Sequence, residues 1–235
     1  FGILISWVIV RKFLINSKKN LSKENIDELL NYTVIGIIIG GRLGYVLFYN
    51  FEYYFFSPLE IFKIWKGGMS FHGGVIGVII ATYYFSLKNK INIFIFLDLI
   101  SLSAPIGIFL GRISNFINSE LYGRETNIFW GVIFEKKDNL LRHPSQIYEA
   151  VFEGVILFIL LNLLYKKYKN LNAGIISSLF LIFYSFFRFF IEFTREPDDQ
   201  IGFVFNSLTM GQMISVIFFV FGTILFFFKK NEINK

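Results

Sequence analysis

The sequence contains no cysteine and only two histidines among its 235 residues. The absence of cysteine excludes disulfide bonds and cysteine-ligated metals, so any thiol used in chemistry has to come from a substrate. The histidines and carboxylates show no spacing of the His-x-x-x-His kind, which argues against a metal site. There is also no internal repeat and no glycine-rich nucleotide-binding loop. We therefore expect neither a metal nor another cofactor.

Apolar residues are abundant instead: 54% of the chain is hydrophobic, 20% is aromatic, and the mean hydropathy is +0.57. A soluble domain does not carry this much apolar surface without long spanning segments. The apolar runs predict about seven transmembrane helices, and therefore an all-α, polytopic membrane protein. The predicted spans are roughly 1–13, 32–49, 72–88, 93–117, 149–165, 174–192 and 209–228. The chain opens inside an apolar run with no cleavage site after it, which we interpret as a truncated N-terminus rather than a signal peptide.

Lysine and arginine are concentrated in alternate connections between the predicted spans. The formal net charge of +6 is explained better by these short loops than by a nucleic-acid surface. The basic segments are the connections 11–31 and 88–92, the turn after the fifth span, and the C-terminal tail. By the positive-inside rule they are cytoplasmic, which places the N-terminus outside and the C-terminus inside.

Arginine occurs inside three of the predicted spans, at Arg42, Arg112 and Arg188. An arginine in hydrocarbon costs about 3 kcal/mol on insertion scales, so three of them on different spans indicate a polar cavity within the bundle. Their fixed positive charge predicts an anionic occupant. Other polar residues lie toward the same, outer end of the spans: His72, Asn115, Glu149, Glu153, Tyr184 and Glu192. Asp98 lies near the inner end of its span, and we interpret it as interfacial.

Two interpretations of this arginine-rich cavity are open. Two guanidinium groups facing one cavity, such as those of Arg112 and Arg188, can clamp a phosphate because each offers a planar fork of donors. The alternative is an internal network in which Glu149, Glu153 and Glu192 supply carboxylates that only lock the helices together. We favour ligand binding, because the arginines outnumber the well-placed acids.

His72 opens the third predicted span. The positive end of a helix dipole favours a neutral imidazole, which can accept a proton as a general base. A lone interfacial histidine is also commonly a capping or hydrogen-bonding residue, so both roles stay open for His72.

Glycine recurs at helical spacing in the second and third predicted spans. The residues are Gly36, Gly40 and Gly44, followed by Gly73, Gly74 and Gly77. Small residues at this spacing let helix backbones approach closely in lipid. We predict that most of them serve packing between the two helices.

The longest predicted connection, 118–148, lies outside and is expected to form a small folded cap. It ends in HPSQIYEA, where Pro144 suits the first turn of a helix. We interpret His143 as a structural residue at this helix start rather than a catalytic one. The prediction is a single integral-membrane domain over residues 1–235, with the cap inside it.

Five stretches, in this order along nearly the whole chain, resemble the prolipoprotein diacylglyceryl transferase family. They read GGRLGYVLFYN, GGMSFHGGVIGV, GRISNFINSELYGR, RHPSQIYEA and YSFFRFFIEFTREPD. The run that begins at Gly111 resembles the signature of that family. Ser119 stands where a glycine is common in the family. The chain also opens at Phe1-Gly2, where the family usually has a His-x-Tyr-Gly stretch, so a role for that tyrosine hydroxyl is unsupported here.

The resemblance implies transfer of a diacylglyceryl group from phosphatidylglycerol to the lipobox cysteine of a bacterial prolipoprotein, with release of glycerol phosphate. This is the first step of lipoprotein maturation, in the bacterial cytoplasmic (inner) membrane, with the active site toward the outer leaflet. An anionic lipid donor fits positive charge within the membrane. A thiol supplied by the substrate fits an enzyme without cysteine.

The resemblance also gives the candidate residues expected roles. Arg112 and Arg188 bind the phosphate and stabilise it as it leaves, His72 takes the thiol proton, and Tyr184 hydrogen-bonds the headgroup. The expected headgroup pocket also includes Asn115, Glu120 and Gly123. Arg42, Glu192 and Arg195 are second-tier candidates that orient the others.

A transporter or flippase for an anionic lipid is the main alternative to an enzyme. It would also use buried arginines, but such proteins usually show repeated halves and polar sites near the bilayer midplane. Here the polar groups gather toward one side and no repeat is visible. A purely structural membrane scaffold does not explain three arginines within the spans.

Overall fold

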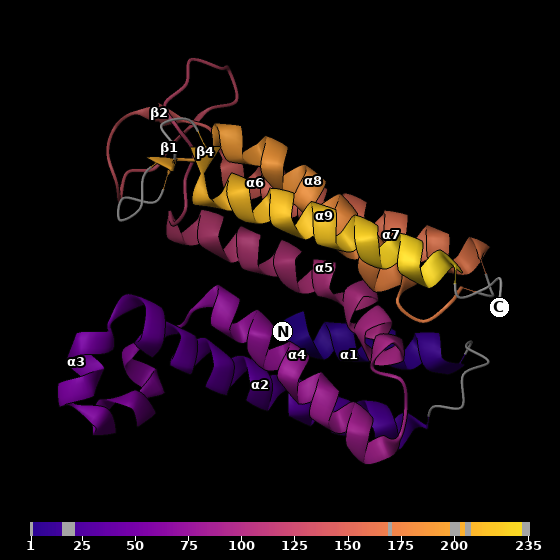
Figure 1. The fold of residues 1–235 in the computed structure, drawn as a ribbon. Coiled ribbons are helices and arrows are strands. Elements are labelled where there is room, and N and C mark those ends of the chain that lie inside the picture. The colour runs from indigo at the N-terminus through magenta and orange to yellow at the C-terminus, as the bar shows by residue number, and fades with distance from the viewer. Residues whose placement is uncertain (1, 16–21, 169–170, 198–202, 205–207, 232–235) are drawn as a thin grey trace. The chain divides into compact units, whose positions relative to one another are not determined.

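The computed structural model describes residues 2–15, 22–168, 171–197, 203–204 and 208–231, and helices dominate it (Figure 1). The elements in chain order are α1 (Gly2–Ile15), α2 (Lys23–Tyr49), α3 (Phe51–Phe56), η1 (Pro58–Phe62), η2 (Ile64–Lys66), α4 (Phe71–Asn89), α5 (Ile93–Asn118), β1 (Val132–Ile133), β2 (Leu141–Arg142), α6 (Ser145–Glu149), the π-helix η3 (Ala150–Ile156), α7 (Leu157–Lys167), α8 (Ile175–Ile191), η4 (Glu192–Thr194), β3 (Phe203–Val204), β4 (Leu208–Thr209) and α9 (Met210–Asn231). This confirms the all-α prediction apart from short strands.

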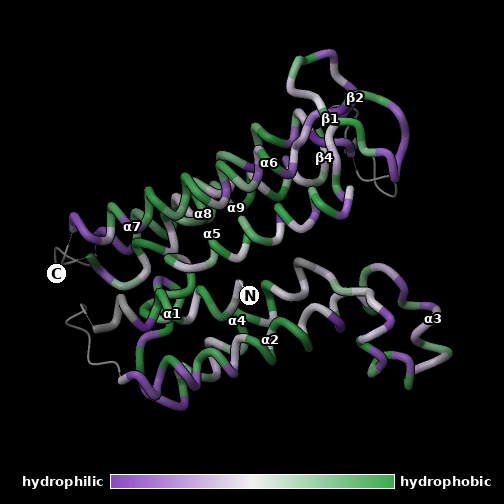
Figure 2. The backbone as a smooth tube through the Cα atoms, turned by 180° about the vertical axis from the view of Figure 1, so that it is seen from behind, coloured by the Kyte–Doolittle hydropathy of each residue, from purple (hydrophilic) through white to green (hydrophobic). Residues whose placement is uncertain are grey.

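Five helices in the described part of the chain are long and apolar enough to cross a membrane. They are Lys23–Tyr49, Ile93–Asn118, Ser145–Lys167, Ile175–Thr194 and Met210–Asn231. Coloured by hydropathy, α5, α8 and α9 are mainly green along their length (Figure 2). The prediction of a polytopic membrane protein is confirmed. The number of seven spans stays a prediction, because α1 and α4 are helical where expected but are not among these five.

Two helices begin earlier than the apolar runs predict. α2 begins at Lys23 because Ser22 and Asn25 form a capping box, in which Ser22 Oγ accepts from the Asn25 amide at 3.2 Å and Asn25 Oδ1 accepts from the Ser22 amide at 3.0 Å. The helix expected from residue 149 begins at Ser145, directly after Pro144. Both first turns are polar, so a search for apolar runs does not find them.

The chain divides into two compact units, each with its own packing. Unit 1 comprises Phe1–Val10 and Asp98–Lys235, and unit 2 comprises Arg11–Leu97. The single-domain prediction is not tested by this division.

In unit 2, the glycines of α2 and α4 form the closely packed interface that their spacing predicts. A Cβ added at Gly36 would lie 2.6 Å from the carbonyl oxygen of Gly77, and one added at Gly44 would lie 2.6 Å from Gly73 Cα. Real Cβ atoms essentially never come within 3.0 Å of another atom in this way. The backbones therefore meet at a distance that only glycine permits.

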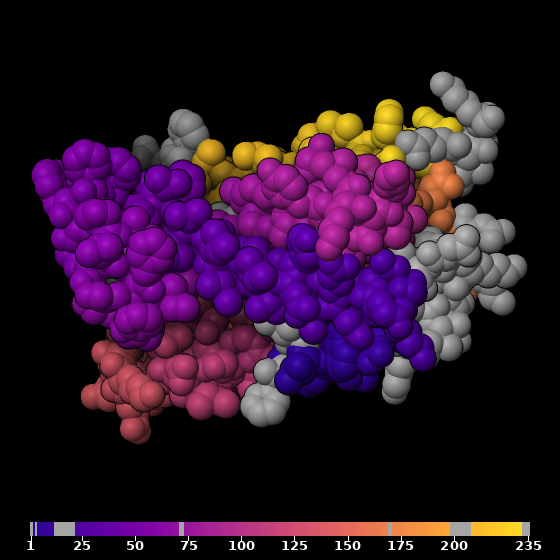
Figure 3. All heavy atoms as spheres, turned by 90° about the horizontal axis from the view of Figure 1, so that it is seen from below, coloured from indigo at the N-terminus to yellow at the C-terminus, as the bar shows by residue number. Residues whose placement is uncertain are grey.

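Arg42 of α2 organises the segment between α2 and α4. Its guanidinium donates to the backbone carbonyls of Glu60 at 2.7 Å, Ile61 at 2.8 Å and Gly67 at 2.6 Å. Its charge also lies over the ring of Tyr54, 5.0 Å from the centroid. Space-filled, this segment forms one continuous mass, shown in purple at the left of Figure 3. The buried charge of Arg42 is thus satisfied by backbone carbonyls within unit 2.

In unit 1, α5, α7 and α8 share an apolar core, and α9 runs beside α8 (Figure 1). The core is formed by Leu102, Leu157, Leu161 and Ile176, all buried. Asp98 of α5 is also buried, and its carboxylate accepts from the amides of Gly174 at 2.9 Å and Ser177 at 2.8 Å. Asp98 thus caps the N-terminus of α8, where the helix dipole favours a negative charge. Asp98 is therefore a buried helix cap, and its interpretation as an interfacial residue did not include this role.

Segment 118–148 forms a folded cap at one end of unit 1. β1 pairs antiparallel with β2, and isolated bridges join Glu125 to Arg142 and Gly123 to Arg195. This is the end at which α5 and α8 terminate and α6 and α9 begin (Figure 1). Polar residues near these helix ends are therefore brought together beside the cap.

A buried arginine–glutamate cluster as candidate active site

Charged side chains from several helices of unit 1 meet at the cap end. Arg112 lies in the last turns of α5, and Arg188 lies in the last turn of α8. Glu149 and Glu153 are four residues apart at the start of the helix that follows the cap, and Glu192 is four residues after Arg188. This spacing places each pair on one helix face, so that the two helices present carboxylates and guanidinium groups to each other.

Arg188 contacts three carboxylates. Its Nη1 pairs with Glu149 Oε1 and lies 3.7 Å from Glu153 Oε1. Its Nη2 lies 2.7 Å from Glu192 Oε2. The planar fork of a guanidinium suits several carboxylates at once, so Arg188 ties together α6, η3 and η4.

Arg112 and Arg195 complete the cluster around Glu149. Arg112 Nε lies 3.2 Å from Glu149 Oε2, and Arg112 Nη2 lies 3.8 Å from Glu153 Oε2. Arg195 Nη1 lies 3.5 Å from Glu149 Oε1. Glu149 is therefore shared by three arginines.

The cluster is buried and its formal charges balance. The side chains of Glu149 and Glu153 are 0% exposed, whereas that of Arg112 is 17% exposed. Such burial costs several kcal/mol per ion unless opposite charges compensate. The expectation that arginines outnumber the acids was wrong, because three arginines face three glutamates here. The internal network therefore exists, and a ligand has to bind in its presence.

The start of α9 adds a partner for Glu192 that sequence reasoning missed. Thr209 Oγ1 donates to Glu192 Oε1 at 2.9 Å. Thr209 and Gln212 cap the helix reciprocally through their amides, at 3.0 Å and 3.3 Å. A Cβ at Gly211 would lie 2.6 Å from Glu192 Oε1, so glycine lets the carboxylate come close. The Thr-x-x-Gln pattern before an apolar run is the signal that predicts this cap.

The chain turns sharply beside the cluster after α5. Ser119 and Leu121 adopt left-handed conformations with φ of 61° and 52°. The amide of Glu120 donates to the carbonyl of Asn115 at 2.9 Å, and its carbonyl accepts from Gln146 Nε2 at 2.6 Å. Asn115 is half-buried and Glu120 is exposed. The turn thus holds these two predicted headgroup residues next to the start of α6.

Gly123 is enclosed by backbone from two other segments. Its amide donates to the carbonyl of His143 at 3.0 Å, and it bridges to Arg195. A Cβ at this position would lie 2.6 Å from the carbonyl oxygen of Thr194. Close packing therefore requires glycine at position 123, independently of any role of this residue in binding a ligand.

Comparison with known proteins assigns this arrangement to a family. The family model described as prolipoprotein diacylglyceryl transferase matches residues 1–228. The chain belongs to this family. Relatives from Rickettsia felis and Rickettsia akari are each 52% identical over 225 residues, covering 95% of this chain and 87% of the relative. A relative from Rickettsia bellii is also 52% identical and is covered to 86% of its length. All three are named phosphatidylglycerol–prolipoprotein diacylglyceryl transferase.

One residue of the turn, Ser119, has a conformation that is unusual for a residue other than glycine. Its φ of 61° lies in the region that glycine adopts most easily. An L-residue pays roughly 1–2 kcal/mol in this conformation. The serine is therefore tolerated here with some backbone strain.

Arg142 holds the cap of this transferase-family chain together and was missed by sequence reasoning. Its Nη2 lies 2.7 Å from Asp138 Oδ2, and its Nη1 lies 3.3 Å from Glu196 Oε2 and donates to the carbonyl of Gly123 at 3.2 Å. It also lies 5.1 Å from the ring centroid of Tyr122. Hydrogen bonding from Arg142 lowers the pKa of Asp138. Asp138 is four residues before Arg142, but Gly123 and Glu196 are far from Arg142 in the sequence, so no local pattern reveals the whole cluster.

His143 contacts the helix that follows the cap, and its structural role stays a prediction. Its Nδ1 lies 3.3 Å from the hydroxyl of Tyr148, which also accepts a hydrogen bond from Trp130 Nε1 at 2.6 Å. Partial burial lowers the pKa of His143, so the ring is neutral at pH 7. These contacts join the cap to the first turn of the following helix.

Tyr184 lies one helical turn before Arg188. Its ring stacks on Phe180 with centroids 5.7 Å apart and packs against the core of unit 1. It also interacts electrostatically with Glu153 and Arg188. Tyr184 therefore connects the apolar core to the charged cluster.

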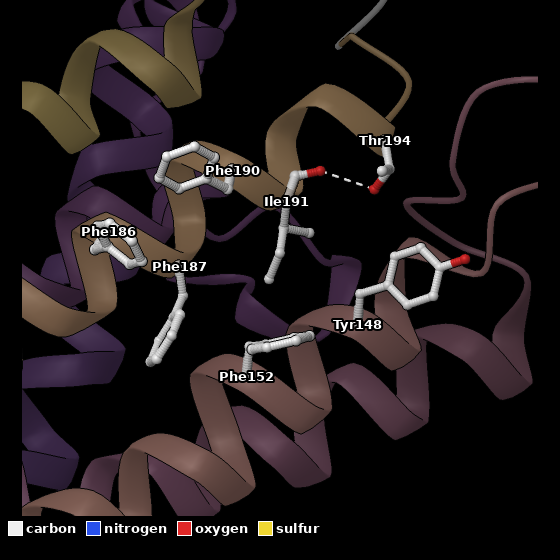
Figure 4. Close-up of a pocket in the computed structure, with 7 residues that line it drawn as sticks. All are labelled: Tyr148, Phe152, Phe186, Phe187, Phe190, Ile191 and Thr194. Atoms are coloured by element: carbon white, nitrogen blue, oxygen red, sulfur yellow. Dashed lines mark hydrogen bonds between the residues drawn. The ribbon is translucent and has the colours of Figure 1, made fainter.

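An apolar pocket of about 380 Å³ lies between the helix that follows the cap and α8. It is lined by Tyr148, Phe152, Phe186, Phe187, Phe190, Ile191 and Thr194. Figure 4 shows aromatic rings of α8 on one side and those of Tyr148 and Phe152 on the other. Tyr148 precedes Glu149 and Phe187 precedes Arg188 in the chain, so the pocket and the cluster are built on the same helices.

Two predicted site residues belong to unit 2. His72 lies in the first turn of α4, whose cap Ser70 accepts from the amide of Gly73 at 3.2 Å. This confirms the predicted helix start, but the side chain of His72 lies outside the described residues. Arg42 contacts backbone carbonyls instead of carboxylates. The cluster described above is therefore built from unit 1 residues.

Proposed function

We propose that this chain transfers the diacylglyceryl group of phosphatidylglycerol to the thiol of a prolipoprotein cysteine, forming a thioether and releasing glycerol phosphate. Membership of the family and the names of its relatives support this reaction. The observation that carries the chemistry is the pair Arg112 and Arg188, joined through Glu149 at one end of apolar helices. A lipid phosphate at the edge of the hydrocarbon requires cations at such a place.

Arg112 and Arg188 bind the lipid phosphate in this proposal. The ion pairs of Arg112 with Glu149 and Glu153 use Nε and Nη2, and its side chain is the most exposed of the three arginines. A phosphate oxygen can therefore gain charge-assisted hydrogen bonds at Arg112 while the pair with Glu149 persists. As the glyceryl C–O bond breaks, negative charge grows on the phosphate and these bonds strengthen, which stabilises the transition state.

The lipobox cysteine of the prolipoprotein supplies the nucleophile. A free thiol has a pKa of about 8.5, so a base increases the fraction of reactive thiolate. We assign this role to His72 at the start of α4, where a helix N-terminus favours a neutral imidazole. Arg42 donates to the carbonyls of Gly67 and Gly68 and so fixes the backbone just before this helix.

The remaining predicted residues surround the phosphate in this proposal. Asn115 and Glu120, positioned by the turn after α5, form the headgroup pocket with Gly123, and Tyr184 hydrogen-bonds the same headgroup. Glu192 and Arg195 orient the arginine pair through the contacts of Glu192 with Arg188 and of Arg195 with Glu149.

The apolar pocket on the same helices as the cluster receives part of an acyl chain. Its aromatic lining and its place on the helices that carry Glu149 and Arg188 support this assignment. Replacing Phe190 by tryptophan narrows the pocket, so we expect slower transfer from long-chain than from short-chain phosphatidylglycerol. An unchanged ratio of the two rates in a competition assay would place the acyl chains elsewhere.

The protein is proposed to lie in the bacterial cytoplasmic membrane as one transferase domain with an external cap. The basic connections support an outside N-terminus, a cytoplasmic C-terminus and a cluster toward the outer leaflet. Labelling of single cysteines introduced at Asn139 in the cap and at Lys230 in the last turn of α9, from either side of sealed vesicles, tests the orientation. Labelling of both from the same side contradicts it.

Mass spectrometry of a lipobox peptide tests the reaction. The chain is reconstituted in liposomes containing phosphatidylglycerol and incubated with the peptide. We expect a diacylglyceryl mass increment on the cysteine that disappears when the cysteine is replaced by serine. No increment with a folded protein refutes the transferase proposal, and movement of labelled lipid between leaflets would then indicate a flippase.

A further inference from the structure

The charge balance of the cluster has a consequence for lipid binding, which rests on the function proposed above. Among the described residues, Arg112, Arg188 and Arg195 face the carboxyl groups of Glu149, Glu153 and Glu192, so three formal positive charges face three formal negative charges. A phosphodiester brings one more negative charge, so four anions would face three cations. An uncompensated charge in a buried site is costly, and the usual escape is a change of protonation. One carboxyl group is therefore expected to carry a proton when the phosphate is bound.

The three glutamates differ in how well their negative charge is stabilised. Glu149 contacts three arginines, two of them at 3.2 Å and 3.5 Å and the third more closely. Glu192 accepts from the hydroxyl of Thr209 at 2.9 Å and lies 2.7 Å from Arg188. Glu149 and Glu192 thus each have one oxygen, Oε1, that accepts a hydrogen bond, whereas the Oε2 atom of each has none among the described residues.

Glu153 has none of these short contacts. Its nearest cationic nitrogens are Arg188 Nη1 at 3.7 Å and Arg112 Nη2 at 3.8 Å, which are ion pairs but not hydrogen bonds. Both of its carboxylate oxygens are buried and lack a hydrogen-bond partner among the described residues. Of the three carboxyl groups, Glu153 is therefore the one whose protonation costs least.

Glu153 is also held firmly in place. It lies in the π-helical segment Ala150–Ile156, an irregularity that is frequent at functional sites. A Cβ added at the next residue, Gly154, would lie 2.7 Å from Phe109 Cβ, so the helix is packed tightly against α5. The titratable and charged groups that face Glu153 are Arg112 from α5, Glu149 from α6, Tyr184 and Arg188 from α8, and Arg195 after η4. Close packing of this helix on α5 therefore fixes the backbone that carries Glu153.

We propose that Glu153 carries a proton when the lipid phosphate is bound, so that three arginines face two carboxylates and one phosphodiester. Glu153 is then a positioning residue, which sets the net charge that Arg112 and Arg188 offer to the lipid. The arrangement matches a headgroup phosphate with a single negative charge. It also explains how arginines already paired with glutamates accept a further anion.

The test compares the wild-type protein with the isosteric variants Glu153→Gln and Glu149→Gln, using dihexanoyl phosphatidylglycerol as the probe in detergent micelles. Infrared spectra of the wild-type complex should contain the C=O stretch of a protonated carboxyl group, which Glu153→Gln should lack and Glu149→Gln should retain. Wild-type affinity should fall as the pH rises through the titration of Glu153, by up to about tenfold per pH unit for one linked proton. Glu153→Gln should bind without this pH dependence, since glutamine mimics the neutral carboxyl group.

The outcomes separate this inference from the proposed function. A protonated-carboxyl band that persists in Glu153→Gln, or that is missing from the wild-type complex, overturns the assignment of the proton to Glu153. If the wild-type protein still transfers the diacylglyceryl group in that case, the proposed function is retained and only the inference about Glu153 is rejected. If a folded wild-type protein fails to bind the probe and Arg112→Ala behaves identically, both proposals are wrong.

Discussion

Replacing Gly44 by alanine tests how closely α2 and α4 pack. The added Cβ would lie 2.6 Å from Gly73 Cα, whereas ordinary van der Waals contacts begin at 3.4 Å. The two backbones therefore have to separate by about 1 Å, and overpacking of this kind costs about 1–3 kcal/mol. The higher helix propensity of alanine offsets at most about 1 kcal/mol. We expect the free energy of unfolding to fall by up to about 2 kcal/mol.

Gly107→Ala in α5 is the matched control. A Cβ there meets nothing within 4 Å, so this substitution changes helix propensity without a steric clash. Its free energy of unfolding should stay the same or rise by up to about 1 kcal/mol. Denaturing titration of the purified proteins in mixed micelles, followed by circular dichroism, gives both values. Equal stabilities of the Gly44 and Gly107 variants would refute the close packing of α2 on α4.

Three further substitutions test the local structure. Ser119→Gly should raise the free energy of unfolding by up to about 1 kcal/mol by relieving the left-handed conformation, and a lower value in the same titration would contradict the turn geometry. Arg42→Met removes the donor from several buried carbonyls, and each carbonyl left without a hydrogen bond destabilises the fold by about 1–3 kcal/mol. Segment 50–70 should therefore open more often, so that a protease cuts it in the variant but not in the wild type. The pKa of Asp138 is lowered in the folded cap by Arg142, so its stabilising effect is present above an unfolded pKa of about 3.9 and is lost as the pH falls through the lower folded value. Protease resistance of the cap should therefore decrease between about pH 5 and about pH 2 in the wild type, and Asp138→Asn should lose most of this dependence.

The helices could be predicted because apolar runs and glycine spacing are local patterns. The run after Tyr32 and the repeat from Gly36 to Gly44 indicated both α2 and its packing on α4, and the glycine contacts confirm that interpretation. The first turn of α2 was not predicted, since Ser22 and Asn25 form a polar cap that hydropathy does not register.

The charges of the candidate site could be predicted only in part. Arginines within apolar runs stand out, so Arg112 and Arg188 were found, but their balance with Glu149, Glu153 and Glu192 depends on three-dimensional contacts. Counting the acidic residues by their depth along the predicted helices underestimated how many carboxylates face the arginines. Contacts between distant segments, such as Asp98 with the start of α8 and Arg142 with Glu196, leave no local pattern.

The role of the cluster in handling the lipid phosphate is tested most directly by the rate at which Arg112→Ala transfers the diacylglyceryl group to a lipobox peptide. This rate is compared with that of the wild type and with that of Lys230→Ala, a variant at the exposed end of α9. Removal of one group that stabilises a developing charge typically lowers a rate by about 10²–10³. We expect a loss of this size for Arg112→Ala, an unchanged rate for Lys230→Ala, and the same circular dichroism for all three proteins. A folded Arg112→Ala variant that forms the thioether at the wild-type rate would contradict the role of the cluster in handling the lipid phosphate.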